Sequence, residues 1–203
     1  MEKMINYEGL SSVKNIISTF LQIAEKLQRS FLYHKTELPE IEKLSSMINE
    51  QVRNELLNLS SHNKEKASQL IEIYKRLEIV HDSLTRISMA IQAKTEERVL
   101  FSDKAVKEVE ALFNNLQSML KNMVDFITTK NAVLSKHITE DQARYEISCQ
   151  NFSTGHEERL IEGICMPRSS TIYLNILNNL CNISWHLVTI VSYSVEMIEQ
   201  QEK

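Results

Sequence analysis

The sequence contains little glycine and little proline, with three and two residues of each among 203. Phosphate-binding loops, hairpin turns and the short connections of an α/β sheet depend on these residues for their backbone conformations. Their scarcity argues against a sheet-based fold and favours long helices. Because 42% of the residues are hydrophobic, the chain can still bury a sizeable core, which excludes a disordered protein.

Neither sign of charge dominates the sequence. The 23 basic and 27 acidic residues are spread along the chain and give a formal net charge of −4. Proteins that bind nucleic acid concentrate lysine and arginine in a patch that displaces counterions from phosphates. The sequence has no such stripe. We therefore expect no nucleic acid among its partners.

Long apolar runs are absent as well. The most apolar stretch, residues 172–198, is interrupted by four asparagines and by His186, whereas a membrane-spanning helix needs about 20 predominantly apolar residues. No apolar run follows Lys3, so no secretory signal is predicted. These features predict a chain without a membrane span.

Cysteine is scarce too, and the three cysteines, Cys149, Cys165 and Cys181, include no CxxC pair. An odd number of cysteines without such a pair is typical of packed thiols in a reducing compartment rather than of a disulfide framework. The cysteines therefore predict a cytoplasmic protein.

What the sequence does have is a helical period, because apolar residues recur every three or four positions along almost the whole chain. Pro39 is placed to open the second helix, Ser102 to cap the fourth, and Ser169 or Ser170 to cap the sixth. The six predicted helices cover about residues 8–34, 39–59, 64–97, 103–128, 139–162 and 169 almost to the end.

The second half repeats the first, in the order long helix, medium helix, long helix. Leu10 and Phe20 of the first predicted helix correspond to Val106 and Leu116 of the fourth, and the third and sixth predicted helices match in the same way. Any two amphipathic helices can be aligned to some degree, but here the order is preserved as well. We predict a single all-α domain over residues 1–203, a six-helix bundle of two three-helix repeats at about 8–98 and 102–202.

Two segments resemble a known family. In the third predicted helix, LEIVHDSLTRIS places Glu78 and Asp82 four positions apart, and residues 155–190 contain an HxxRL sequence from His156 and an LxxLxNIxxH sequence ending at His186. These motifs are similar to those of PhoU-like domains, and the C-terminal ones resemble most closely the cytoplasmic C-terminal domain of bacterial sodium/phosphate cotransporters. Asn182 stands where that pattern has arginine.

The resemblance implies a six-helix PhoU-like bundle that regulates phosphate uptake without catalysis. It further implies that the chain lies in the cytoplasm at the inner face of the cell membrane. Its partner would be a sodium-dependent membrane phosphate transporter, either in the same polypeptide or as a separate protein.

The resemblance also implies a metal site, because PhoU-like domains bind clusters of iron or zinc through carboxylates matched here by Glu78 and Asp82. Four positions apart in a helix, these side chains project from one face and can bridge a cation. The alternative is that they form ordinary ion pairs with basic neighbours on the helix. The equivalent positions of the second repeat hold Cys181 and Trp185, which do not match, since tryptophan cannot ligate a metal.

No catalytic motif accompanies these features, because HExxH, CxxC, GxSxG and glycine-rich phosphate loops are all missing from the sequence. We therefore predict that the protein is not an enzyme. Two other functions stay open: a stand-alone metal-binding adaptor of phosphate signalling, which requires metal at Glu78 and Asp82, and a structural helical scaffold that forms a homodimer through apolar surface.

Overall fold

The computed structural model describes the backbone of residues 2–33, 37–60 and 67–202, and within these ranges the chain forms helices and no strand. The predicted all-α six-helix bundle is confirmed. The expected end of the first helix at residue 34 and the expected start of the third at residue 64 lie outside the described residues. The helices are α1 (Glu2–Tyr33), α2 (Leu38–Ser60), α3 (Ser68–Glu96), α4 (Asp103–Thr129), α5 (Ala132–Ile161) and α6 (Pro167–Glu202).

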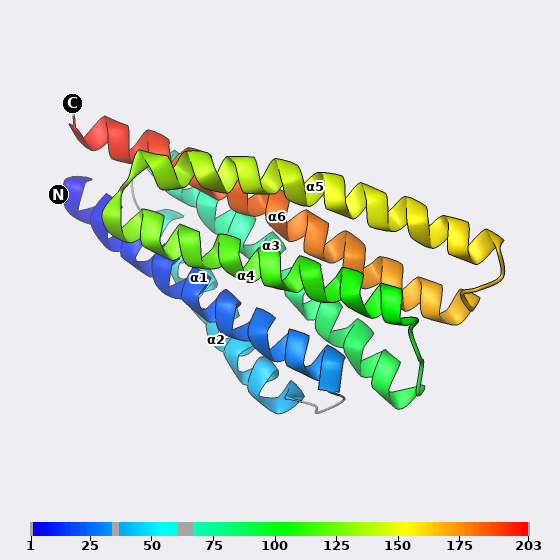
Figure 1. Cartoon of the computed structure of the whole chain (residues 1–203). Coiled ribbons are helices and arrows are strands. Elements are labelled where there is room, and N and C mark those ends of the chain that lie inside the picture. The colour runs from blue at the N-terminus through cyan, green and yellow to red at the C-terminus, as the bar shows by residue number, and fades with distance from the viewer. Residues whose placement is uncertain (1, 34–36, 61–66, 203) are drawn as a thin grey trace.

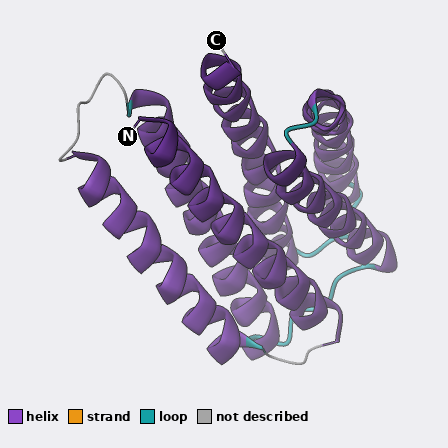
Figure 2. Ribbon diagram, turned by 90° about the vertical axis from the view of Figure 1, so that its left-hand side faces the viewer, coloured by secondary structure: helices purple, strands orange, loops and turns teal. Residues whose placement is uncertain are grey.

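The two halves of the chain are built alike and pack along their long helices (Figure 1). The most extensive contact is between α3 and α6, and α1 packs on α4. The second helix of each half lies on the outside: α2 packs on α3 and α1, as α5 packs on α6 and α4. The medium length expected for the fifth helix was wrong, because α5, with 30 residues, is longer than α3 and α4. Figure 2, at right angles to the first view, shows the helices of the bundle running side by side.

The core runs through both halves as one cluster of buried side chains. Phe20 of α1 and the corresponding Leu116 of α4 are fully buried, and so are Leu77 of α3 and the corresponding Leu180 of α6. Each such side chain contributes about 1.5–3 kcal/mol of transfer free energy. The apolar stripes that predict the repeat are therefore the stripes that hold the two halves together.

Two helix starts depend on capping side chains. Ser102 caps α4 as predicted, because its Oγ accepts a hydrogen bond from the backbone N–H of Ala105 at 3.3 Å. The start predicted for the fifth helix, at residue 139, was wrong. Asn131 caps α5 earlier, where its side-chain oxygen accepts from the backbone N–H of Val133 at 2.9 Å.

The start predicted for the sixth helix was also late. Pro167 occupies the first position of α6. The backbone N–H at that position has no partner within a helix, so a proline, which lacks this N–H, is well tolerated there. Ser169 and Ser170 lie inside the first turn and donate their hydroxyl hydrogens to the carbonyl of Met166, at 2.8 and 3.0 Å. Neither serine is the cap.

The two ends of the bundle differ. The chain termini and the α4–α5 connection lie at one end, and the α3–α4 and α5–α6 connections lie at the other (Figure 1). Among the described residues, no helix combines the length and the apolarity that crossing a bilayer requires.

Candidate functional site

The predicted metal ligands Glu78 and Asp82 lie on the exposed side of α3. Between them in sequence, His81 turns toward α2: its Nε2 lies 2.6 Å from Ser45 Oγ, and its Nδ1 lies 3.6 Å from Asp82 Oδ1. Within the part of the chain that the structure describes, no group of three or more His, Cys, Asp or Glu side chains is arranged to hold a metal ion. Protein zinc sites use three or four side-chain ligands, so iron or zinc at this pair stays a prediction and would be held weakly.

The equivalent positions of the second repeat have no ligand to offer. Cys181 is bonded to Cys149, and Trp185 is 52% exposed. The Trp185 ring lies 5.6 Å from the guanidinium carbon of Arg76 and meets the ring of His186 edge to face, with centroids 4.9 Å apart. The two repeats share a backbone arrangement but present different chemistry on α3 and α6.

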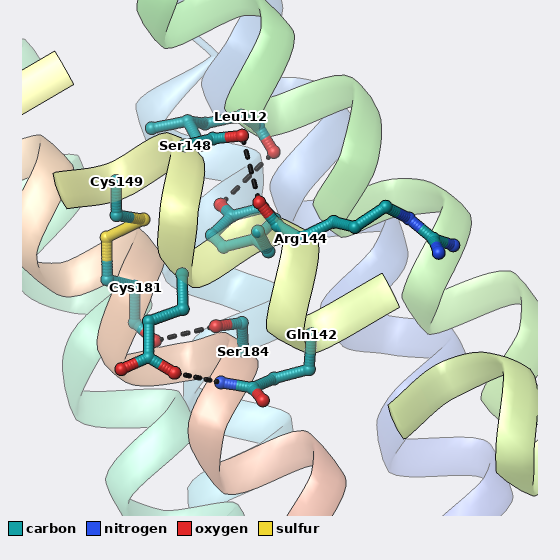
Figure 3. Close-up of a disulfide and its surroundings, with 9 residues drawn as sticks. Leu112, Gln142, Arg144, Ser148, Cys149, Cys181 and Ser184 are labelled. Atoms are coloured by element: carbon teal, nitrogen blue, oxygen red, sulfur yellow. Dashed lines mark hydrogen bonds between the residues drawn. A yellow bond between two sulfur atoms is a disulfide. The ribbon is translucent and has the colours of Figure 1, made fainter. Parts of the chain in front are cut away.

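A disulfide joins Cys149 of α5 to Cys181 of α6 (Figure 3), so the prediction of three packed thiols was wrong. Their Cα atoms are 6.4 Å apart, within the range that a disulfide spans. The pairing links residues 32 positions apart on neighbouring helices, so no local motif such as CxxC predicts it. Since only Cys165 is a free thiol, the cysteines no longer argue for a reducing compartment.

A buried ion pair connects α4 and α5. Arg159 donates two hydrogen bonds to Glu108, from Nη1 to Oε1 at 3.0 Å and from Nη2 to Oε2 at 2.8 Å. Tyr173 of α6 donates its hydroxyl hydrogen to Glu108 Oε2 at 2.7 Å. Burial disfavours the charge of Arg159, but its bonds to Glu108 outweigh this and hold the pKa of Arg159 above its ordinary value. The carboxylate is thereby compensated although it is removed from water.

His156 completes this group of side chains. Its ring is 2% exposed and stacks on Tyr173, with centroids 4.4 Å apart. Neither ring nitrogen has a hydrogen-bond partner among the described residues. Burial and the nearby Arg159 lower the pKa of His156. A neutral imidazole still carries one N–H, and an unmatched buried donor is a feature that calls for a partner.

The sequence motifs contain two of these four side chains. His156 and Arg159 belong to the HxxRL sequence, whereas Glu108 and Tyr173 were not singled out. One signal for Glu108 was available, because it falls on the apolar stripe of its helix between Ala105 and Leu112. A carboxylate at a position that faces the core implies a buried cation opposite.

We expect the free energy of unfolding to fall as the pH decreases from about 7 to about 5, because the unfolded histidine titrates near 6.5. The pKa of His156 is lowered by burial and by Arg159, while Glu108 and Glu157 oppose the shift. Below pH 6.5 the unfolded chain thus binds a proton that the folded chain refuses, so this stability is present above 6.5 and lost below it. Urea unfolding at several pH values measures the slope. His156→Phe should reduce the slope, and the part that remains is expected from His186, whose pKa is also lowered by burial. An unchanged slope in that variant would contradict the assignment.

No family model matches the chain. Its sequence is similar to YjbB of Salmonella typhimurium, a protein named for the export of inorganic phosphate, with 24% identity over 148 residues that cover 71% of this chain and 27% of YjbB. YjbB of Escherichia coli O157:H7 is 25% identical over 147 residues, covering 71% of this chain and 26% of that protein. The chain therefore spans about a quarter of the length of the curated relatives it matches.

Solved structures decide the fold. PhoU from Pseudomonas aeruginosa superposes with a TM-score of 0.84 over 98% of this chain and 100% of that one, at 13% identity. The chain has the PhoU fold. PhoU from Streptococcus pneumoniae agrees, with a TM-score of 0.80, 14% identity and 98% coverage of both chains. The PhoU-like bundle implied by the sequence motifs is thus confirmed, and the relation to sodium/phosphate cotransporters stays a prediction.

Within this PhoU fold the two halves carry different chemical groups. The first half presents Glu78 and Asp82 on an exposed helix face. The second half contains the disulfide and the buried pair of Glu108 and Arg159.

Proposed function

We propose that the chain is a non-catalytic regulatory domain of phosphate transport that acts on a sodium-dependent phosphate transporter from the cytoplasmic face of the membrane. One observation carries the proposal: YjbB, named for phosphate export, is similar to 71% of this chain in a segment that makes up only about a quarter of YjbB. A match to most of this chain but to only about a quarter of YjbB is expected for a domain that lies within, or acts beside, a longer transport protein. The PhoU fold of the chain supports the same role.

A helical bundle of this kind regulates by binding. Contact with the transporter, in the same polypeptide or as a separate protein, would favour one transporter conformation only to the extent that the domain binds that conformation more tightly. A tenfold difference in affinity corresponds to about 1.4 kcal/mol and shifts the two populations by the same factor. No chemical step is required.

The test is phosphate flux in cells. Deleting the coding region of this chain from its own genome, and restoring it from a plasmid, should change and then restore the rates of radioactive phosphate uptake and efflux at low and at high external phosphate. Separate measurements of uptake and efflux distinguish import from export, and replacing sodium by potassium tests the coupling ion. Fluxes that are the same with and without the chain under all these conditions would contradict the proposal.

The second candidate function is a stand-alone metal-binding adaptor, favoured by the placement of Glu78 and Asp82 on one exposed face of α3. It requires bound metal in protein purified without chelator. Elemental analysis for iron, zinc and manganese, beside a variant carrying Glu78→Gln and Asp82→Asn, separates the two functions. Stoichiometric metal that the variant loses supports the adaptor. Metal-free protein supports the regulatory domain of a transporter instead. A scaffold that forms a homodimer would show in the measured mass but would leave phosphate flux unchanged.

A further inference from the structure

A pocket of about 500 Å³ is lined by residues of the α3–α4 and α5–α6 connections. Both connections lie at the end of the bundle opposite the chain termini (Figure 1). Its walls come from the α3–α4 connection, residues 97–102, from residues 164–166 of the α5–α6 connection, from Arg168 and Ser169 in the first turn of α6, and from His156 of α5. The pocket thus combines segments from both halves of the chain. It lies away from the exposed carboxylate pair of α3.

Two long helices begin at this pocket. Ser102, the cap of α4, and Ser169, in the first turn of α6, both line it. The first turn of a helix leaves backbone N–H groups without intrahelical partners, and the helix dipole places partial positive charge there. At α4 the N–H of Ala105 is already taken by Ser102 Oγ, and Pro167 supplies no N–H at the start of α6. The remaining first-turn N–H groups and the two helix dipoles still favour an anion in the pocket that both helix starts share.

The charged side chains of the walls point to the same class of ligand. Arg98 and Arg168 line the pocket, and Glu97 is the one acidic residue among the described residues that do so. Arg168 Nε donates to Glu97 Oε2 at 2.7 Å, and this bond holds the pKa of Glu97 below its ordinary value. Two cations and one anion leave a net positive wall, and Arg98 is held there with a backbone φ of 53°, a conformation more usual for glycine.

His156 provides an independent observation. It lines the pocket, is 2% exposed, and has no partner for either ring nitrogen among the described residues. Glu108 beside it is already engaged, since it accepts from Arg159 and from Tyr173, and Arg159 Nε is a second buried donor without a partner among the described residues. Both ring nitrogens are shielded from solvent in the structure, so a ligand oxygen would accept the unmatched imidazole N–H once a neighbouring side chain at the inner end of the pocket shifts aside.

We propose that this pocket binds a phosphate group, held between the first turns of α4 and α6 by Arg98, Arg168 and His156. Arginine suits a tetrahedral dianion because its guanidinium donates two parallel hydrogen bonds. The group is either inorganic phosphate or the phosphoryl end of a small ester, which present the same oxygens. The site would make phosphate a ligand of the regulatory domain and in that respect rests on the proposed function, although binding itself is measured without a transporter.

The experiment is calorimetric titration of the 203-residue chain with inorganic phosphate, glycerol 3-phosphate and ADP in separate runs. We expect saturable binding that Arg168→Gln weakens about tenfold or more through loss of a charge-assisted contact. His156→Phe should weaken it too, while the aromatic stack on Tyr173 is kept. Glu97→Gln should strengthen binding about threefold, because it frees Arg168 and removes the negative charge from the wall.

The matched control is Arg144→Gln, since Arg144 is also an exposed arginine paired with a carboxylate, that of Asp141, and lies outside this pocket. Its affinity for phosphate should equal that of the unchanged chain. Saturation by inorganic phosphate with this pattern of variants identifies the free ion, and saturation by an ester alone with the same pattern identifies an esterified phosphate. The proposal is overturned if no probe saturates, or if Arg168→Gln and Glu97→Gln bind as the unchanged chain does. Unaltered phosphate flux with intact binding would instead count against the regulatory function alone.

Discussion

Replacing Arg159 with methionine is expected to lower the free energy of unfolding by about 3–5 kcal/mol, because it leaves a buried carboxylate without its cation. Glu108 is 7% exposed and receives two of its hydrogen bonds from Arg159. Tyr173 would remain as a donor, but one hydroxyl does not balance a full charge. Urea unfolding at neutral pH, followed by circular dichroism, gives the difference.

Two controls separate the buried charge from the loss of a large side chain. Adding Glu108→Gln to Arg159→Met removes the charge together with its partner, so the double variant should be more stable than the single one. Arg144→Met breaks an exposed pair with Asp141 and should cost less than about 1 kcal/mol. An equal effect of Arg144→Met and Arg159→Met would show that Glu108 does not depend on its partner.

Replacing both Cys149 and Cys181 with serine is expected to destabilise the protein by about 4 kcal/mol in the absence of reductant, on the chain-entropy account of cross-links. The bond closes a loop between residues 32 positions apart and ties α5 to α6. Without it the unfolded chain gains conformational freedom, and the native helices lose a covalent restraint. Unfolding in urea measures the change in midpoint.

Dithiothreitol provides the internal check. The unchanged chain should fall to the stability of the double variant in reductant, whereas the double variant should not respond. Cys165→Ser removes the free thiol and should leave the midpoint where it was. A count of three free thiols in protein purified without reductant would show that Cys149 and Cys181 are not bonded.

The helices could be predicted wherever their buried faces are continuous. Phe20 and Leu116 belong to stripes that repeat every three or four residues, a signal that is local and needs no knowledge of the rest of the fold. The start of α5 carries no such signal, because Ile138 is the one side chain fully buried in its first two turns, 132–138. That segment is helical because Asn131 caps it, and a single capping residue is easily overlooked.

The side chains of the second half could be predicted only in part, because their pairing is set by how helices meet. Glu108 and Arg159 are 51 residues apart, and Cys149 and Cys181 are 32 apart. Nothing local specifies which faces of α4, α5 and α6 come together. His156 was noticed through its motif, but its burial without a hydrogen-bond partner is a property of the folded chain.

The α3–α4 connection is also the covalent joint between the two halves of the chain, and it forms one wall of the pocket. A molecule wedged between this joint and the start of α6 would fix the angle at which the halves meet. Because α6 has 36 residues, at a rise of about 1.5 Å each, a small rotation at the joint becomes a displacement of several ångströms at the far end. Such a rotation would also have to shift the packing of α3 on α6, which is the most extensive contact in the bundle.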